Sequence, residues 1–327
     1  MRGRGVTLAG IGFDLSASDP RLPLGDLFGW VLRTRRSPQH TWSIALSLAP
    51  SGRAVCDRPE APWTPIFFHG RTRVFTHERR YRFWDGTSQF DVDPAARRIT
   101  GEVHPHSLHD AHTFTHATML ILVAVCLRLE QRFHLHGGLV ELPGTGPVLI
   151  AGDAGRGKST TTLSLLTQGG RFVGDDALYL VPTSHRVFGF PKPLHVSERT
   201  ARAFPFLLPL WSDAREADTG KRAIPPRKAL PGRLRASLPW PRALLLPVVA
   251  DRDVTTCEAI GPGDALGELL GASALVAVDG LPFSAEHLSA LRDVADAAPA
   301  RLVLLGRDAL SDPTLVPARF AASLRRG

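Results

Sequence analysis

The sequence predicts an α/β fold with a mixed sheet, in which a phosphate-binding domain follows a smaller β-rich domain. Two patterns support this prediction. Across residues 41–103, apolar and polar residues alternate with the period of two that is typical of strands. At residues 147–170, an apolar run, a glycine-rich loop and a helical segment follow one another. We therefore expect a β-rich domain at residues 1–103, a connecting helical segment at 104–133 and the phosphate-binding domain at 134–327.

The N-terminal region shows its pattern only after a less regular start. Residues 1–40 are rich in Gly, Pro and Arg, and within them only 24–32 has the pattern of a short helix. An Asp85-Gly86 pair further on indicates a tight turn between two strands. We expect the strands of this region to form an antiparallel meander at residues 42–48, 71–75, 80–84, 89–92 and 98–103.

A histidine-rich segment at residues 104–116 precedes an apolar helix. His112 and His116 have the i, i+4 spacing that zinc sites use. However, Pro105 interrupts the segment and no Glu follows His112, so we favour a polar entry into the helix over a metal site. The apolar stretch at 117–127 is about half as long as a bilayer-spanning helix, and we expect it to be a buried helix that runs to about Phe133.

The second half of the chain combines strands and helices. One helix lies between the last two predicted strands, which indicates a βαβ unit. A proline-interrupted extended segment is expected at 188–194, and a polar, charged and mobile loop at 213–228. The predicted strands are 134–142, 148–151, 171–176, 177–181, 244–250, 274–278 and 301–305, and the predicted helices are 159–168 and 284–298.

Composition excludes several classes of protein. A hydrophobic content of 43% and a charged content of 21% are ordinary for a globular protein. The net charge of +8 comes from scattered arginines without an aromatic-interleaved basic motif, which argues against a dedicated nucleic-acid binder. Cys56, Cys126 and Cys257 match no metal or redox spacing, which fits a reducing cytoplasm. No signal peptide or membrane span is expected.

The glycine-rich loop has the form G-x-x-x-x-G-K-S at residues 152–159. Its glycines allow successive backbone N–H groups to point at a phosphate, and the following helix contributes the partial positive charge of its N-terminus. Lys158 can reach the β- and γ-phosphates, and the Ser159 hydroxyl can bind Mg²⁺. The predicted nucleotide-binding residues are Gly152, Asp153, Ala154, Gly155, Arg156, Gly157, Lys158, Ser159 and Thr160.

An acidic pair, Asp175 and Asp176, follows the next predicted strand after the loop and its helix. Phosphoryl transfer to an alcohol needs a base that takes the hydroxyl proton and ligands for a metal ion. Adjacent carboxylates in a sheet are also costly unless a cation lies nearby. From the residues alone, a plain turn or cap explains the pair equally well.

The segments HLHGGLVEL, GDAGRGKST and FVGDDALYL together resemble the catalytic domain of HPr kinase/phosphorylase and related bacterial serine kinases. This resemblance covers about residues 130–195. It implies a P-loop kinase domain of the type shared with phosphoenolpyruvate carboxykinase, with ATP and Mg²⁺ as cofactors. A later segment that is typical of true HPr kinases is missing, so the chain looks like one of the divergent relatives. Some of these phosphorylate peptide or small-molecule alcohols, including precursor peptides of natural-product pathways.

The same resemblance implies roles for individual residues. Asp175 would be the base that faces the acceptor hydroxyl, and Asp176 would hold Mg²⁺ together with Ser159. His136 would lie close to Asp175 and tune it, with Lys158 completing the catalytic set. A core histidine whose hydrogen bonds are satisfied is the alternative interpretation of His136.

These observations favour an ATP- and Mg²⁺-dependent kinase whose acceptor is a serine of a protein or peptide. A small-molecule alcohol kinase and a nucleotide-binding regulatory module without transfer activity stay open, as does a nucleic-acid-dependent ATPase. Lys192, Lys221 and Arg222 are candidate contacts to the phosphate or acceptor, with a solvated basic loop as the alternative. A homo-oligomer also stays open, because related kinases assemble into oligomers.

Overall fold

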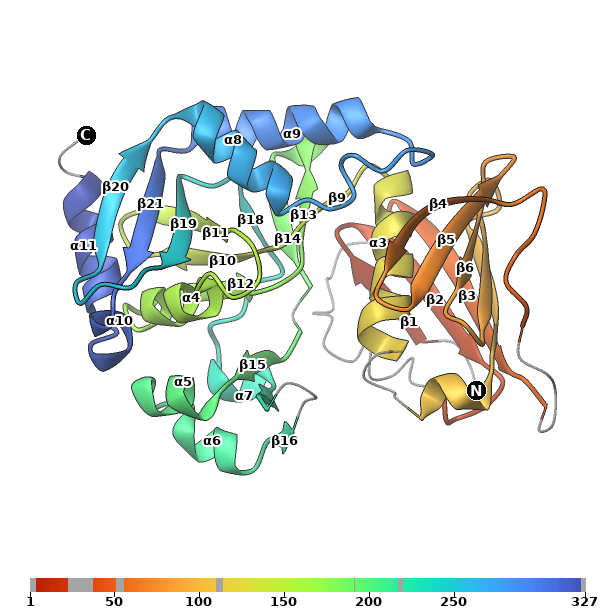
Figure 1. Cartoon of the computed structure of the whole chain (residues 1–327), viewed down its shortest axis with the longest axis horizontal. Helices are drawn as coiled ribbons and strands as arrows, with labels where there is room; N and C mark the ends of the chain where they lie inside the picture. Colours follow the sequence, from red (N-terminus) through yellow and green to blue (C-terminus); the bar gives the residue numbers. More distant parts are fainter. Residues whose placement is uncertain are drawn as a thin grey trace. The chain divides into compact units, whose positions relative to one another are not determined.

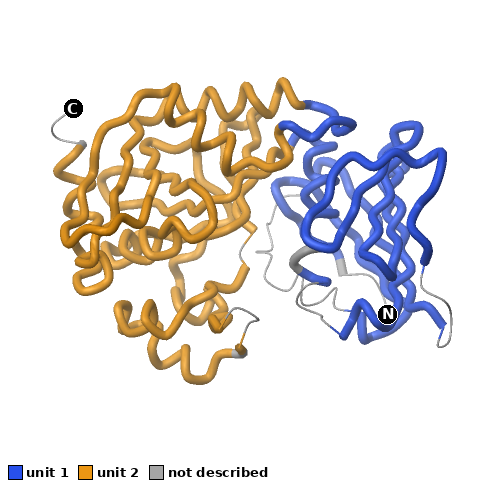
Figure 2. Tube along the Cα trace, in the orientation of Figure 1, with its two compact units in different colours: residues 1–131, 277–283 blue, residues 132–276, 284–327 orange. Residues whose placement is uncertain are grey.

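The computed structural model describes residues 4–22, 38–50, 56–109, 114–190, 192–216 and 220–324. The short helix expected at 24–32 lies outside these residues. The chain divides into two units, drawn in different colours in Figure 2. Unit 1 comprises residues 1–131 and 277–283, and unit 2 comprises residues 132–276 and 284–327.

Unit 1 is built on an eight-stranded sheet in the order β1-β2-β3-β8-β7-β6-β5-β4 (Figure 1). Its strands alternate buried and exposed side chains, as β3 does, so one face of the sheet carries the core of the unit. The strands are β1 Arg4–Leu8, β2 Ile11–Ala17, β3 His40–Leu48, β4 Thr64–His69, β5 Thr72–His77, β6 Arg80–Trp84, β7 Gln89–Asp93 and β8 Arg98–Val103.

The strand pairing differs in part from the predicted meander. Strands β5, β6, β7 and β8 pair antiparallel in succession. Strand β3, which we expected in that meander, instead pairs parallel with β2 and with β8. The sequence analysis missed β1, β2 and β4. The first two form a hairpin whose turn residues Ala9 and Gly10 both have positive φ, in a region that composition alone marked as irregular.

The helical part of unit 1 consists of a 3₁₀ turn, η1 (Pro105–Leu108), a π-helical turn, η2 (Phe114–Met119), and α3 (Leu120–Leu129). The α-helix therefore begins three residues later than predicted. Its Arg128 is 1% exposed and donates from Nε to the Pro282 carbonyl oxygen at 2.8 Å. His112 lies outside the described residues, and within them no group of three or more His, Cys, Asp or Glu side chains could hold a metal ion.

Unit 2 contains a six-stranded mixed sheet in the order β12-β10-β11-β19-β21-β20. Strands β11, β19 and β21 run parallel, and the other strands pair antiparallel with them or with each other. The strands are β10 Gly137–Leu142, β11 Gly146–Ala151, β12 Arg171–Gly174, β19 Ala243–Val249, β20 Thr256–Ile260 and β21 Ala300–Leu305.

Helices lie on both sides of this sheet. Figure 1 shows α4 and α11 on one side and α8 and α9 on the other. Leu163, Leu166 and Phe320 from the first pair belong to one large buried cluster with residues of β10, β11 and β21. The helices of unit 2 are α4 Lys158–Leu166, α5 Glu198–Ala203, α6 Leu208–Ser212, α7 Pro226–Ala229, α8 Pro262–Gly271, α9 Ser284–Ala297, α10 Asp308–Ser311 and α11 Leu315–Leu324, and η3 is Pro182–Ser184.

Two smaller sheets complete unit 2, in the orders β18-β14-β13-β9 and β15-β17-β16. The strand predicted at 134–142 is divided by His136 into β9 and β10, which belong to different sheets. Residues 274–278, predicted as a strand, form turns. The loop predicted at 213–228 contains β16, β17 and α7. The remaining strands are β9 Phe133–Leu135, β13 Leu178–Val181, β14 Arg186–Gly189, β15 Leu194–Val196, β16 Arg215–Glu216, β17 Arg222–Ile224 and β18 Ser237–Pro239.

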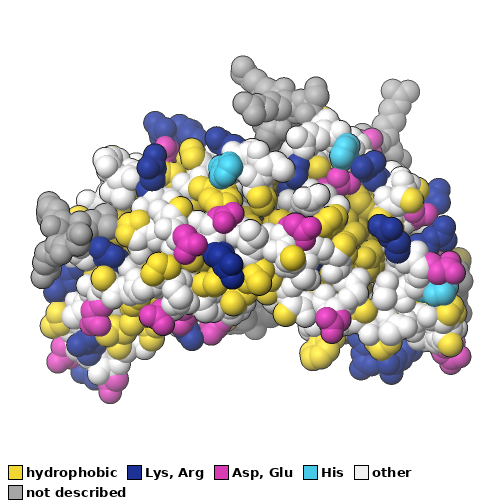
Figure 3. All heavy atoms as spheres, turned by 90° about the horizontal axis from the view of Figure 1, so that it is seen from above, with side chains coloured by type: hydrophobic (Ala, Val, Ile, Leu, Met, Phe, Trp, Pro, Cys, Tyr) yellow, Lys and Arg dark blue, Asp and Glu magenta, His cyan; other side chains and the backbone are white. Residues whose placement is uncertain are grey.

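Two surface properties bear on function. On the face shown in Figure 3, Lys and Arg side chains form several separate groups with Asp and Glu side chains between them. This distribution agrees with the scattered arginines of the sequence. Throughout the part of the chain that the structure describes, none of the helices combines the length and apolar character that a bilayer crossing requires.

We predict that Gly137→Ala destabilises unit 2. A Cβ atom at Gly137 would lie 2.6 Å from the Ile150 carbonyl oxygen, so the β10–β11 pair would have to shift. The free energy of unfolding, measured by urea denaturation, should fall by about 1–3 kcal/mol. Gly267→Ala in α8 is the matched control, because a Cβ atom there meets nothing within 4 Å. That variant should gain about 0.5–1 kcal/mol, and equal losses in both variants would contradict the prediction.

Candidate active site

The glycine-rich loop joins the end of β11 to the start of α4. Gly152, Gly155 and Gly157 all have positive φ, at 137°, 79° and 98°, so the loop uses backbone conformations that other residues rarely adopt. Gly157 caps the helix in the left-handed region. A Cβ atom at Gly157 would lie 2.3 Å from Leu305 Cδ1 on the neighbouring strand, so close packing also requires glycine there.

The side chains of Arg156 and Asp153 stabilise the loop on the side away from the cavity described below. Arg156 donates to Glu268 of α8 at 2.7 Å, and its other terminal nitrogen lies 3.1 Å from the Asp153 carboxylate. Neither Asp153 nor Arg156 lines the cavity described below. Both were predicted as nucleotide-binding residues from their place in the motif, and their side chains instead hold the loop against α8.

Lys158 lies folded over the loop. Its ammonium group donates to the Asp153 carbonyl oxygen at 2.8 Å, and the side chain is largely buried. Burial lowers the pKa of Lys158, while the nearby carboxylates of Asp176 and Asp175 oppose this change. The lysine is therefore held at the loop by an acceptor that a phosphate could replace.

Asp175 lies directly after β12 and faces the first turn of α4. Burial raises the pKa of this carboxyl to about 6, and the neighbouring Asp176 charge adds to the increase. The hydroxyls of Ser159 and Thr162 favour the charged form and oppose the shift. Asp175 Oδ1 is buried and has no hydrogen-bond partner among the described residues. On β10, Gly138 leaves room for this approach, since a Cβ atom there would meet Thr162 Oγ1 at 2.5 Å.

Asp176 has a different environment from its neighbour. Its Oδ1 lies 2.9 Å from His136 Nδ1, and its Oδ2 forms an ion pair with the Lys192 ammonium group. Although burial acts in the opposite direction, Lys192 and His136 hold the pKa of Asp176 well below its ordinary value. The structure thus brings His136 to Asp176, whereas the resemblance implied that it would lie close to Asp175. It also brings Ser159 to Asp175.

These groups share one cavity of about 320 Å³ in unit 2. Lys192 and Lys221 both line it, as two of the three predicted cationic contacts. Arg222 does not: its guanidinium group stacks over the Trp211 ring at 4.2 Å and donates to the Trp211 and Ser212 carbonyl oxygens. The lining residues are His136, Ala154, Gly155, Gly157, Lys158, Ser159, Thr160, Asp175, Asp176, Lys192, Pro193, His195, Ser197, Thr200 and Lys221.

Four lining residues were missed by the sequence analysis, namely Pro193, His195, Ser197 and Thr200. They come from β15 and from the start of α5, where the Ser197 hydroxyl accepts from the Thr200 backbone N–H at 3.2 Å. A serine three residues before a threonine at a helix start is a recognisable capping pattern. That pattern locates a helix end, but nothing in it indicates that the end borders a phosphate loop.

Comparisons with known proteins match the segment of the chain that contains most of this site. Residues 127–197 match the HPr Serine kinase C-terminal domain family. The HPr kinase/phosphorylase of Malacoplasma penetrans is 39% identical over 62 residues, covering 19% of this chain and 20% of that protein. The HPr kinase/phosphorylase of Pediococcus pentosaceus is 51% identical over 49 residues, covering 15% of each chain. The chain thus matches only about a fifth of the length of these curated relatives.

The Hpr(Ser) kinase/phosphatase from Coxiella burnetii is one of the solved structures that resemble this chain. It has a TM-score of 0.28 and 14% sequence identity, covering 59% of this chain and 97% of that chain. The matched segment 127–197 holds the glycine-rich loop, its helix and the acidic pair. In this segment the chain is similar to HPr kinases.

The raised pKa of Asp175 predicts a pH-dependent cost to stability. Between about pH 4 and 6 the folded protein keeps a proton on Asp175 that the unfolded chain has already released. The free energy of unfolding contributed by this group therefore falls as the pH rises through that window. Relative to Asp175→Asn, the wild-type protein should lose about 2 kcal/mol of stability between pH 4 and pH 7.

Urea denaturation of both proteins across this pH range measures the difference. The exposed Asp213→Asn variant controls for the loss of one negative charge. A difference between wild type and Asp175→Asn that stays constant with pH would contradict the assignment.

Proposed function

We propose that this protein is an ATP-dependent kinase that transfers the γ-phosphate to a hydroxyl group, with a serine of a protein or peptide as acceptor. The observation that supports this most strongly is the shared cavity. The phosphate loop, Lys158 and the Asp175 carboxylate all face the same 320 Å³ space. A phosphate cradle and a carboxylate base are two of the parts that phosphoryl transfer to an alcohol requires.

Magnesium fits the oxygen atoms at this site. Asp175 Oδ1 is buried without a partner in the described part of the chain, and the Ser159 hydroxyl is near enough to influence its pKa. Hard oxygen ligands of this kind suit Mg²⁺. Ser159 would hold the ion together with a carboxylate of the acidic pair. When bound, Mg²⁺ would neutralise charge on the phosphate oxygens.

The two carboxylates differ in their suitability for each role. A pKa of about 6 would leave Asp175 ionised at neutral pH, which favours it as the general base that the sequence analysis expected. Asp176 is the remaining carboxylate for the metal ion, and it would have to leave the Lys192 ammonium to take part. The closeness of Ser159 to Asp175 supports a second assignment, in which Asp175 helps to hold the metal and Asp176 is the base.

The transfer step follows from these positions. Backbone N–H groups of the loop and the α4 N-terminus would hold the phosphates, and Lys158 would exchange the Asp153 carbonyl oxygen for the γ-phosphate. The acceptor oxygen forms a bond to phosphorus while the bond between phosphorus and the bridging oxygen of the leaving ADP breaks. The hydroxyl proton passes to the carboxylate. Lys192 and Lys221 add positive charge at the same cavity.

The acceptor is proposed to be a protein or peptide because the named relatives are kinases of the protein HPr. A precursor peptide of a natural-product pathway is the particular acceptor that the divergent resemblance suggests. A metabolite alcohol would be the acceptor if the same cavity served a small-molecule kinase. An assembly of identical chains is a further part of this proposal.

Asp175→Asn should separate binding from transfer. Loss of the base should lower the transfer rate by about 10²–10⁴-fold, while the affinity for Mg·ATP changes little. Transfer of label from γ-labelled ATP is measured on a lysate of the source cells and on serine peptides, with mass spectrometry of the product. Asp213→Asn, which lies outside the cavity, should keep full activity. The absence of transfer to any acceptor would point to a nucleotide-binding module, and transfer unchanged in Asp175→Asn would exclude Asp175 as the base.

The pH dependence distinguishes the two assignments of Asp175. As a base, Asp175 must be ionised, so kcat/KM should rise about tenfold per pH unit up to about pH 6 and then level off. This midpoint should not depend on the Mg²⁺ concentration. If Asp175 is instead a metal ligand, Mg²⁺ competes with the proton and the midpoint should move to lower pH as Mg²⁺ is raised. Profiles of kcat/KM against pH at two Mg²⁺ concentrations distinguish the base from the metal ligand.

A further inference from the structure

Strand β4 (Thr64–His69) ends the sheet of unit 1 with an unusual edge. In the described part of the chain it pairs only with β5, so its outer backbone N–H and C=O groups have no strand beside them. Ile66, Phe67 and Phe68 follow one another along it, and Phe68 is 79% exposed. Edge strands that carry large apolar residues invite pairing with another chain, and proteins normally avoid them.

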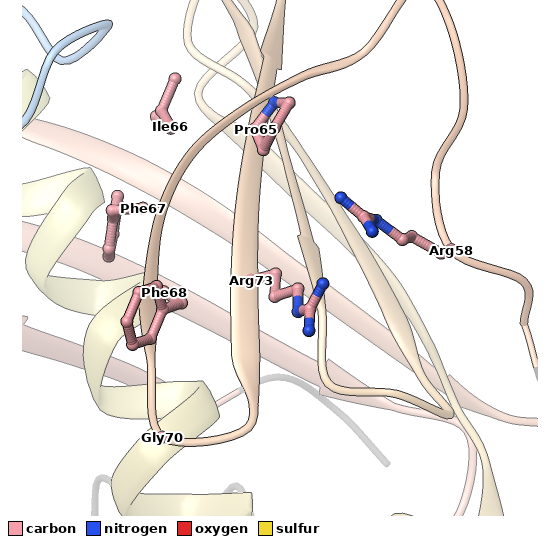
Figure 4. Close-up of a pocket in the computed structure, with 7 residues that line it drawn as sticks. All are labelled: Arg58, Pro65, Ile66, Phe67, Phe68, Gly70 and Arg73. Carbon is pink, nitrogen blue, oxygen red and sulfur yellow. The ribbon is translucent and has the colours of Figure 1, made fainter.

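A cavity of about 500 Å³ lies along this edge. Its lining residues, drawn in Figure 4, are Arg58, Pro65, Ile66, Phe67, Phe68, Gly70 and Arg73. Phe68 and Arg73 are direct partners across the β4–β5 pair, so their side chains share one face of the sheet. In Figure 4 the guanidinium groups of Arg58 and Arg73 lie on the same side of β5.

The positive charges of Arg58 and Arg73 in this cavity have no acidic partner among the described residues. Arg58 and Arg73 form no ion pair with the acidic residues that the structure describes, and their guanidinium groups lie 6.0 Å from the ring centres of Phe75 and Trp84. Other arginines of the same sheet are paired, as Arg82 is with Asp91 at 2.6 Å. The β4 edge therefore presents two uncompensated positive charges beside an apolar strand.

Two neighbouring cavities share lining residues with this one or with each other. A second cavity of about 320 Å³ shares Arg58 and Pro65 with the first, and a third of about 200 Å³ shares Trp63 with the second. Carboxylates line the second and third cavities, namely those of Glu60, Asp91 and Asp93, so the acidic side chains of a bound segment would lie at the first cavity. Arg82 stacks over the Trp63 ring at 4.2 Å, where the second and third cavities meet.

We propose that the β4 edge binds an extended acidic peptide segment of a partner protein. The peptide would pair with β4 through its backbone and place acidic side chains against Arg58 and Arg73. Apolar side chains on its other face would contact Phe67, which lies on the opposite face of the strand from Phe68 and Arg73. A single-stranded nucleic acid fits less well, because a sugar-phosphate backbone cannot pair with the free N–H and C=O groups of a strand edge as a peptide backbone does. This inference does not depend on kinase activity.

Selection of random ten-residue peptides displayed on phage tests the proposal directly. The full-length protein is the bait, and a variant carrying Arg58→Glu and Arg73→Glu is used in parallel. We expect enrichment of peptides in which acidic and apolar residues alternate, and at least a tenfold loss of their affinity in the charge-reversed variant. That variant should instead select basic peptides. Arg21→Glu, at another exposed arginine of unit 1 that lies outside these cavities, is the control and should keep wild-type selection.

Two further measurements examine the pairing and the class of partner. N-methylation of alternate residues of a selected peptide removes backbone donors and should weaken binding at least tenfold if the peptide pairs with β4. Circular dichroism and ATP binding verify that each variant is folded. No enrichment, enrichment without acidic residues, or affinity unchanged in the charge-reversed variant would overturn the proposal. Tighter binding of a ten-nucleotide single-stranded DNA, lost in the same variant, would replace it with a nucleic-acid site.

Discussion

The candidate site depends on a break in strand pairing between β9 and β10 on one segment and between β12 and β13 on the other. Leu139 pairs with Gly174 in the six-stranded sheet, and Leu135 pairs with Leu178 in the four-stranded sheet. Between these registers, residues 136–138 face residues 175–177 without ladder pairing. Both segments of the chain pass from one of these sheets to the other at this point. His136, Asp175 and Asp176 are therefore free of strand pairing beside the phosphate loop. A continuous sheet would have kept these groups in the ladder and directed their side chains to opposite faces.

The same interruption explains how two neighbouring carboxylates coexist. One of them, Asp176, is compensated by Lys192 and His136 and stays ionised. The other, Asp175, is turned into the protein against α4, where burial favours its protonated form. Adjacent residues thus differ in their affinity for a proton because the backbone directs them to different surroundings. A difference of this kind allows one carboxyl to exchange protons while its neighbour remains charged, which is how paired acids divide roles in many enzymes.

The sequence predicted features that depend on local pattern and missed those that depend on distant partners. The glycine-rich loop needs only adjacent residues, and β19, β21 and α9 follow from continuous apolar patterns. The 134–142 segment reads as one strand because no residue in it shows that β9 and β10 join different sheets. The contact of His136 with Asp176, the position of Arg222 on Trp211 and the edge position of β4 likewise depend on which strands become neighbours, and a single sequence does not contain that information.

Residues 277–283 belong to unit 1 although they follow most of unit 2 in the sequence, and this affects folding during translation. The Pro282 carbonyl oxygen accepts from buried Arg128, and the Gly280 carbonyl oxygen accepts from the Tyr81 hydroxyl at 3.3 Å. Both donors leave the ribosome long before their acceptors. During synthesis, the first 131 residues cannot complete their core, and Arg128 has no Pro282 carbonyl oxygen to bond to until most of unit 2 has been translated. The order of translation therefore delays the maturation of the N-terminal unit.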